Sequence, residues 1–375
     1  MTEPTLFIVA GEPSGDRLGA DLITRLRARQ PVRIMGVGGR AMIAEGLASL
    51  FPMADLSVMG YADVAARMPL LRQRLDQTLA AIHSTQPHCV VLIDSQEFSN
   101  AIATRLRTDG FQGTILLYVA PTIGIWRPER AAAIRPLYDE VLAVFPGDAQ
   151  RMVELGGPPT SYVGHPAARD IKPNPMPEQD GPILLLPGSR TGELTRHLPW
   201  MRAVSTDLGT RDPALRFVIP TLPELVRDLS EATASWPVPP SVVTGIERDT
   251  AFASARLAVA VVGTVTLELA LHGVPMVVCY QLDEGQAGYY RADNPQKLAL
   301  PNIILDQWIV PECVSANDDP AAVCSAAAAL MSDEKAKAAQ RTAFETLSVL
   351  LTVGSTDEPA QDPAERVLAH MRRTS

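Results

Sequence analysis

An apolar run that stops abruptly at a carboxylate is the first feature of this sequence that could carry chemistry. Residues 90–100 read VVLIDSQEFSN, in which Asp94 ends the apolar run and Glu97 follows three residues later. A carboxylate presented by a buried strand can act as a general base that takes a proton from a reacting hydroxyl group. The same pattern is also typical of a strand that ends in an ordinary polar turn. The residues alone leave both interpretations open.

A second apolar run ends in residues that suit an anionic ligand. Residues 184–194 read LLLPGSRTGEL, and a helix is expected to begin soon after the turn at Gly188. Free backbone N–H groups at a helix start, the hydroxyl of Ser189 and the guanidinium of Arg190 together suit a diphosphate. Glu193 in the first turn is expected to complement the helix dipole. The alternative is a plain strand-to-helix turn in which Arg190 pairs with a nearby carboxylate.

A third stretch repeats that arrangement. Residues 261–278 read VVGTVTLELALHGVPMVV, which predicts a strand, a turn at Gly263 and Thr264, and a helix that carries Glu268. A single carboxylate on so apolar a helix needs a hydrogen-bonding partner, and the diol of a ribose is a suitable one. The alternative partner is an arginine or a backbone amide. Two such turns in one half of the chain favour a site for a nucleoside diphosphate.

A glycine-containing loop near the start of the chain is less specific. Residues 9–23 read VAGEPSGDRLGADLI, where two glycines allow a close backbone approach and two polar residues could cap the following helix. The acidic residues of this loop would repel a phosphate, so a tight turn with a capping aspartate is the competing interpretation. The candidate residues of this loop are Gly11, Ser14, Gly15 and Asp16.

His165, in YVGHP, could donate to a ligand or brace a linker.

Composition and absent motifs exclude several classes of function. The net charge of −9 argues against nucleic acid as a partner, because phosphate neutralisation needs clustered Lys and Arg. Neither the P-loop signature nor a G-x-G-x-x-G that opens a helix occurs, and the His and Cys residues lack metal-binding spacings. We therefore expect no metal and no cofactor. The first residues lack the features of a signal peptide, so we expect a cytoplasmic protein with reduced cysteines.

The elements that must position these residues form a regular pattern. Short apolar runs alternate with amphipathic segments, which predicts βαβ units and parallel sheets. The runs are 6–11, 32–39, 88–94, 114–121, 140–146, 183–188, 216–221, 241–245, 257–263 and 274–280. The stretch 164–182 holds five prolines in nineteen residues. We expect an α/β protein of two doubly wound Rossmann-like domains facing across a cleft. Its expected parts are a first domain (1–168), a Pro-rich linker (169–182), a second domain (183–345) and a helical tail (346–375).

Ten stretches of the chain resemble, in order, the motifs of one known family. They are AGEPSGDRLGADLI, GVGGRAMIAEGL, LSVMGYADV, IWRPER, VLAVFP, YVGHP, LLLPGSRTGEL, GTVTLELAL, VPMVVCY, and LPNIIL followed by VPE. The family is lipid-A-disaccharide synthase, and the resemblance spans about residues 6–312. It implies an inverting, metal-independent glycosyltransferase of the GT-B type. The implied reaction joins UDP-2,3-diacylglucosamine to 2,3-diacylglucosamine 1-phosphate through a β-1,6 bond and releases UDP.

The resemblance also implies roles for individual residues. The second half is expected to bind the donor through Gly188, Ser189, Arg190, Gly263, Thr264 and Glu268. Glu97 is the first candidate for the catalytic base and Asp94 the second. The expected acceptor and cleft residues are Gly11, Ser14, Gly15, Asp16, Trp126, Arg127, His165 and Asn302. Arg127 is expected to meet the acceptor phosphate.

Several positions on the acceptor side depart from the family pattern. The family's DxPDF is DSQEF here, so Glu97 stands where an aspartate is usual and Gln96 where a proline is usual. The added methylene moves the carboxylate by more than about 1 Å, a misplacement that can cost around 10²-fold in rate. Ala120, Gly124 and Ala299 replace a serine, a tryptophan and a serine of the family.

These departures leave two alternatives open. One is a related UDP-sugar enzyme with a changed acceptor, or a hydrolase or epimerase. The other is a non-catalytic relative that binds a nucleotide. Because both implied substrates carry acyl chains, we expect peripheral binding at the inner face of the cytoplasmic membrane. Residues 58–75 are expected to contact the membrane; the alternative is that they form an ordinary core helix. A homodimer is a further expectation.

Overall fold

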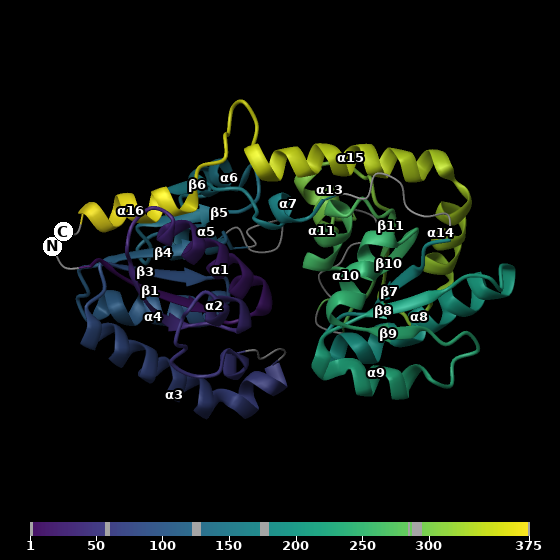
Figure 1. The fold of residues 1–375 in the computed structure, drawn as a ribbon, viewed down its shortest axis with the longest axis horizontal. Helices are drawn as coiled ribbons and strands as arrows, with labels where there is room; N and C mark the ends of the chain where they lie inside the picture. The colour runs from purple at the N-terminus through teal and green to yellow at the C-terminus, as the bar shows by residue number, and fades with distance from the viewer. Residues whose placement is uncertain are drawn as a thin grey trace. The chain divides into compact units, whose positions relative to one another are not determined.

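Two compact units make up the described part of the chain. The computed structural model describes residues 3–56, 61–121, 129–172, 180–283, 286 and 295–373. The first unit comprises Met1–Pro166 together with Leu350–Ser375, and the second comprises Ala167–Val349. Each unit is built on one six-stranded sheet whose neighbouring strands are all parallel (Figure 1).

The sheet of the first unit has the order β2-β1-β3-β4-β5-β6. Its strands are β1 (Thr5–Ala10), β2 (Arg33–Val37), β3 (Cys89–Ile93), β4 (Thr114–Tyr118), β5 (Glu140–Ala143) and β6 (Thr160–Tyr162). Its helices are α1 (Pro13–Arg27), α2 (Arg40–Ala44), α3 (Tyr61–Thr85), α4 (Gln96–Thr108), α5 (Glu129–Ile134), α6 (Asp148–Glu154) and α16 (Pro363–Arg373), with a 3₁₀ turn, η1 (Met53–Leu56).

Helices cover both faces of this sheet. Along β3 the side chains alternate, so that Val90 and Leu92 pack with residues of α3 and α4 on one face. Val91 and Ile93 pack with residues of α1 and α16 on the other face. A strand that is buried on both sides explains why the run is apolar at every position, without the alternation of a half-exposed strand.

The sheet of the second unit has the order β12-β11-β10-β7-β8-β9. Its strands are β7 (Ile183–Leu186), β8 (Phe217–Pro220), β9 (Ser241–Val243), β10 (Leu257–Val261), β11 (Met276–Gln281) and β12 (Glu312–Ser315). Its helices are α7 (Ala167–Asp170), α8 (Thr191–Arg211), α9 (Val226–Thr233), α10 (Gly245–Ser254), α11 (Thr264–Leu271), α13 (Leu300–Leu305), α14 (Ala321–Ser332) and α15 (Glu334–Val353), with a 3₁₀ turn, η2 (Pro223–Leu225).

The predicted fold class of two doubly wound parallel sheets is confirmed, and each of the ten apolar runs overlaps a strand. Neither β6 nor β12 lies in one of these runs, and the four residues of β12 are all half-buried. Of the expected linker, residues 173–179 lie outside the described part. The region after residue 345 is divided: α15 continues to Val353, and α16 packs against α1 in the first unit.

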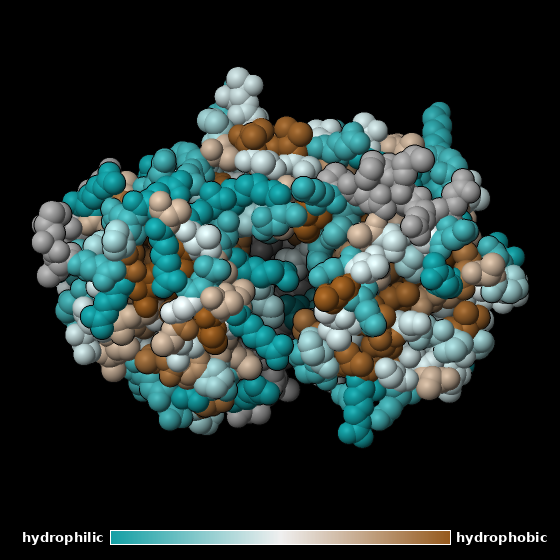
Figure 2. Space-filling view, in the orientation of Figure 1, coloured by the Kyte–Doolittle hydropathy of each residue, from teal (hydrophilic) through white to brown (hydrophobic). Residues whose placement is uncertain are grey.

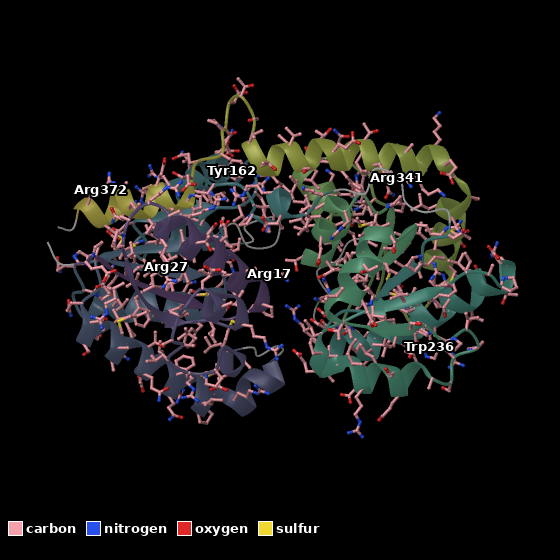
Figure 3. All side chains as sticks on the ribbon, in the orientation of Figure 1. Arg17, Arg27, Tyr162, Trp236, Arg341 and Arg372 are labelled. Atoms are coloured by element: carbon pink, nitrogen blue, oxygen red, sulfur yellow. The ribbon has the colours of Figure 1, made fainter. Side chains whose placement is uncertain are left out.

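A buried charged cluster fastens α16 to the first unit. Glu140 on β5 is 2% exposed and accepts hydrogen bonds from Ser161 at 2.5 Å, Arg366 at 2.8 Å and His370 at 2.6 Å. Burial by itself raises the pKa of Glu140, but the hydrogen bonds outweigh it and hold that pKa below its usual value. In the same unit the hydroxyl of Tyr162, labelled in Figure 3, donates to the carbonyl of Leu350 at 2.6 Å.

Candidate functional site

The carboxyl ends of β1 and β3 meet where the strand order of the first unit reverses. From β1 the chain moves to β2 on one side, and from β3 it moves to β4 on the other; such a switch point is where open α/β sheets bind ligands. Gly11 follows β1, and Asp94 and Ser95 follow β3. A Cβ atom added at Gly11 would lie 2.3 Å from Ser95 Oγ, so these two loops touch and the contact requires glycine.

The backbone at this edge is strained. Asp94 and Ser95 have φ values of 51° and 43°, and Val119, after β4, has a φ of 84°. Left-handed conformations cost a non-glycine residue about 1–2 kcal/mol, and Val119 is β-branched. Hydrogen bonds hold the strained segments in place: the N–H of Asp94 donates to the carbonyl of Tyr118 at 2.9 Å, and Ser99 Oγ donates to the carbonyl of Asp94 at 2.6 Å. The turn after β3 is therefore a strained one that contacts with β4 and α4 hold in place.

Glu97, the first candidate for the base, lies in the first turn of α4. Its side chain is 84% exposed, and its carboxylate pairs with the guanidinium of Arg130 on α5 at 3.3 Å. Asp94, the second candidate, is half-buried. Sequence reasoning missed Arg130, although it lies in the IWRPER motif three residues after Arg127. The pair presents an accessible proton acceptor beside a cation, at the switch point.

The structure corrects the expectation for Asp16. Its side chain is 5% exposed and accepts hydrogen bonds from the backbone N–H groups of Gly39, Ala41 and Met42 at 2.7, 2.8 and 3.1 Å. It therefore caps α2 and not its own helix, because it lies inside α1 and faces the start of α2. This aspartate holds the loop after β2 in place, a supporting role that sequence spacing could not reveal.

The remaining residues of that loop lie in the first turn of α1. Ser14 is half-buried there, and Gly15 is buried. A Cβ added at Gly15 would lie 3.3 Å from a methyl of Ile93, so Gly15 brings α1 close to β3. Both residues lie beside the switch point, and Gly15 has a packing role.

The two turns expected to bind the donor lie side by side in the second unit. The strands β7 and β10 are neighbours, with Leu186 paired to Ala260, and the strand order reverses between them. Gly188 follows β7 with a φ of 102°, and Gly263 follows β10 with a φ of 149°. The helices α8 and α11 begin directly after these turns, at Thr191 and Thr264. The switch point of this unit therefore presents two helix N-termini, where the first backbone N–H groups of a helix have no partner within the helix.

A carboxylate occupies the first of these turns. The backbone N–H of Ser189 donates to Glu193 Oε2 at 3.2 Å, and Arg190 Nη1 lies 2.9 Å from Glu193 Oε1. A Cβ added at Gly188 would lie 2.4 Å from Glu193 Oε2. Arg190 thus has the carboxylate partner that the sequence left open as an alternative. Glu193 does more than complement the helix dipole, because it takes the donors that a phosphate would use.

Glu268, in the second turn, pairs with an arginine. Arg248 on α10 donates to both carboxylate oxygens of Glu268 at 2.8 Å, and its guanidinium lies 4.5 Å from the ring centroid of Phe252. This is the second alternative left open by the sequence. Sequence reasoning missed Arg248, because it lies twenty residues before Glu268 and between two acidic residues. A carboxylate offers about four lone-pair positions, so two remain for a ligand.

The structure also corrects the expectation for Asn302. The residue is fully buried, and its amide nitrogen donates to the carbonyl of Val310 and to Glu312, both at 2.8 Å. Its oxygen accepts from the N–H groups of Ile309 and Val310, so every hydrogen-bonding position is used. Glu312 also accepts from the N–H groups of residues 298 and 299 at the start of α13. Asn302 of the LPN motif and Glu312 of the VPE motif therefore support the start of α13 through internal hydrogen bonds.

Three further candidates remain. His165 stacks against Phe145 at a ring distance of 6.0 Å, and its N–H donates to the carbonyl of Leu351 at 2.9 Å. It braces the segment around Leu351, by which the chain returns to the first unit, and not the expected linker. Trp126 and Arg127 lie outside the described residues.

Comparison with known proteins agrees with this arrangement. The family described as "Lipid-A-disaccharide synthetase" matches residues 6–361. The lipid-A-disaccharide synthase of Nitrobacter hamburgensis is 37% identical, over 98% of this chain and 95% of that protein. The UDP co-structure of S. aureus MnaA superposes with a TM-score of 0.64 at 12% identity, covering 99% of this chain and 96% of that one. The calicheamicin glycosyltransferase CalG4 superposes with a TM-score of 0.57 at 17% identity, covering 100% and 99%. These two structures support the GT-B fold.

Proposed function

The chain belongs to the lipid-A-disaccharide synthase family and is a glycosyltransferase, and we propose that it joins UDP-2,3-diacylglucosamine to 2,3-diacylglucosamine 1-phosphate. The observation that carries the proposal is the pair of turns at the ends of β7 and β10, which suits a nucleoside diphosphate. The acceptor binds beside the strained backbone at Asp94 and Ser95.

The donor diphosphate binds at the Gly188–Arg190 turn. A phosphate oxygen takes the place of the Glu193 carboxylate at the N–H of Ser189, and Arg190 then pairs with the phosphate. The positive end of the α8 dipole favours the charge that develops on the leaving UDP. The ribose hydroxyls donate to Glu268 beside the Gly263–Thr264 turn.

The transfer needs one proton acceptor on the acceptor side. The acceptor hydroxyl oxygen attacks the anomeric carbon of the donor, the bond from that carbon to UDP breaks, and UDP leaves with the electron pair. Glu97 takes the hydroxyl proton, since its carboxylate is exposed and pairs with Arg130 through one of its two oxygens. Asp94 fixes the loop through its backbone contacts with Tyr118 and Ser99.

The deciding experiment measures UDP release from UDP-2,3-diacylglucosamine in detergent micelles, with and without the monosaccharide 1-phosphate. Release that depends on the acceptor, together with a disaccharide product, supports the proposal. Release without acceptor would indicate a hydrolase. Binding of UDP without turnover would indicate a non-catalytic relative. The same assay on Glu97→Gln tests the proposed base. Glu231→Gln is its matched control, because Glu231 is also an exposed helical glutamate paired with an arginine.

The proposal also includes peripheral binding to a membrane. None of the helices in the described part of the chain combines the length and apolarity needed to cross a bilayer. Within the expected contact segment, Met68 is 36% exposed and Arg72 is exposed, which suits an anionic lipid surface, whereas Leu71 packs in the core. Val58 and Met59 lie outside the described residues. Reduced sedimentation of Met68→Glu with anionic vesicles would support contact at this helix.

The proposal also includes a homodimer. On the face drawn in Figure 2, hydrophobic side chains gather near the C-terminal end of α15, where Val349 and Val353 are 58% and 60% exposed. Light scattering coupled to size exclusion would measure the mass of the particle. A monomer mass over the working concentration range would contradict a homodimer.

A further inference from the structure

The ion pair between Arg248 and Glu268 joins two helices of the donor unit. Arg248 lies in α10, which leads from β9 to β10, and Glu268 lies one turn into α11. Both oxygens of Glu268 accept from the guanidinium at 2.8 Å, in the fork geometry that only arginine provides. The two side chains are 23% and 20% exposed, so the pair is neither fully solvated nor fully enclosed.

The surroundings hold this arginine in one orientation. Its guanidinium lies over the ring of Phe252, 4.5 Å from the ring centroid, and the ring centroids of Phe252 and His272 are 5.5 Å apart. Burial alone lowers the pKa of Arg248, but the hydrogen bonds and charge of Glu268 raise it above its usual value. Burial also lowers the pKa of His272, although the charge of Glu268 opposes that shift.

The rest of α11 gives Glu268 no reason to adopt one orientation. Its neighbours Leu267, Leu269, Ala270 and Leu271 are apolar and almost fully buried. A glutamate side chain without a partner would distribute over several rotamers, and a ligand that fixes one of them would have to offset the lost side-chain entropy. Bidentate pairing removes that cost in advance and leaves the outward lone pairs of the carboxylate available.

We propose that Arg248 is a positioning residue for the nucleotide ribose, which orients the carboxylate of Glu268 to accept hydrogen bonds from the 2′- and 3′-hydroxyl groups. This inference rests on the proposed binding of a UDP-sugar. It adds to that function a residue that sets the preference for ribose over deoxyribose. Arg248 does not touch the nucleotide; it acts through Glu268.

The test is the ratio of two dissociation constants, for UDP and for 2′-deoxy-UDP, measured by calorimetry on the full chain. The wild-type protein should bind UDP about tenfold more tightly than 2′-deoxy-UDP, equivalent to about 1.4 kcal/mol. In Arg248→Met the ratio should fall to about twofold or less, chiefly through weaker UDP binding. Arg248→Lys, which keeps the charge but loses the fork, should give an intermediate ratio.

A matched control is available on another helix. Arg211 forms a bidentate pair with Asp207, at 3.0 Å for both contacts, in the last turn of α8 and away from the turn that begins this helix. Arg211→Met therefore removes a similar pair and should leave both dissociation constants unchanged. If Arg248→Met does not fold, as judged by thermal unfolding, Arg248→Lys carries the comparison.

The outcomes separate this inference from the proposed function. A wild-type chain that binds neither nucleotide would contradict the proposed function. A wild-type chain that prefers UDP, with the same ratio kept in both Arg248 variants, would overturn only the role of Arg248. Equal weakening of both nucleotides would show a purely structural role. Tighter UDP binding by Arg248→Met would show that Arg248 competes with the ribose.

Discussion

The carboxylate of Glu193 accepts a hydrogen bond of 3.2 Å from the backbone N–H of Ser189, inside the turn that we assign to the diphosphate. The same carboxylate pairs with Arg190, the cation of that turn. Glu193 thus satisfies the groups that our proposal assigns to the diphosphate. Under that proposal, donor binding replaces the Glu193 carboxylate with a phosphate oxygen, and its free energy includes the loss of these contacts.

Replacing Glu193 with Gln should strengthen UDP binding. The amide can still accept from Ser189, but it carries no charge to repel the diphosphate or to hold Arg190. We expect the dissociation constant to fall about fivefold, equivalent to about 1 kcal/mol. Calorimetry with UDP measures this change, and Glu231→Gln is the control. Weaker binding in the variant would show that Glu193 orients Arg190 and does not compete with phosphate.

Replacing Gly11 with Ala should destabilise the first unit through one contact. The added Cβ would lie 2.3 Å from Ser95 Oγ, and overpacking of this kind costs about 1–3 kcal/mol. In a Ser95→Gly background the clashing hydroxyl is absent, so the same substitution should cost less than half as much. Ser95→Gly alone should be close to neutral, because glycine accepts the left-handed conformation at φ 43°.

A double-mutant cycle followed by denaturant unfolding measures this coupling. Additive effects of Gly11→Ala and Ser95→Gly would mean that the two loops do not touch in solution. The switch point of the first unit would then differ from the arrangement described here.

The pair of Glu97 and Arg130 should matter for catalysis and not for stability. Because Glu97 is 84% exposed, Arg130→Gln should change the free energy of unfolding by less than about 1 kcal/mol. Glu97→Gln should lower kcat by about 10²–10⁴-fold, with little change in donor KM. Glu97→Asp is the informative conservative change. Higher activity would indicate a synthase weakened by the longer side chain, whereas no change would indicate another role for this residue.

The stability of the first unit should fall in acid because of Glu140. The folded protein holds the pKa of this carboxyl below its usual value of 4.5, so folding favours the ionised form. The contribution is complete above about pH 4.5 and is lost as the pH falls through the lower folded-state pKa. Denaturant unfolding between pH 3 and pH 7 should show this loss in the wild type.

Glu140→Gln should remove that acid dependence and lower the stability above pH 4.5. The variant leaves Arg366 without its charged partner, and because Arg366 is 34% exposed the cost should be below the about 3 kcal/mol of a fully buried pair. Ser161→Ala, which removes only one neutral donor to the same carboxylate, is the milder control. If the free energy of unfolding of Glu140→Gln fell between pH 7 and pH 3 as it does in the wild type, the acid dependence would not come from Glu140.

Strands such as β3 and β10 were predictable because a strand that is buried on both faces has an apolar residue at every position. The turns at Gly188 and Gly263 were predictable because glycine and a helix start follow those runs directly. β12 was not, since its residues are half-buried and carry no such run. Local spacing also placed Ser189 and Arg190 in a turn between a strand and a helix, where the structure has them, and their role in ligand binding stays a prediction.

What local spacing could not show is which distant side chain each polar residue meets. Arg248 reaches Glu268 across two helices, and Asp16 caps a helix that begins twenty-four residues later. Asn302 illustrates the same limit, because its motif is specific while its hydrogen bonds are entirely internal. Partners of this kind depend on tertiary packing and leave no periodic signal in the sequence.

The return of the chain to the first unit has a consequence for how the protein is made. Val367 and Met371 of α16 complete one face of the sheet that begins with β1, and Arg366 and His370 satisfy the buried Glu140. On the ribosome, the first unit therefore emerges with an apolar face open and a buried acid unpaired until α16 follows. Its folding must wait for nearly the whole of this sequence to be synthesised, and a nascent chain stopped before residue 363 would be a substrate for chaperones and proteases.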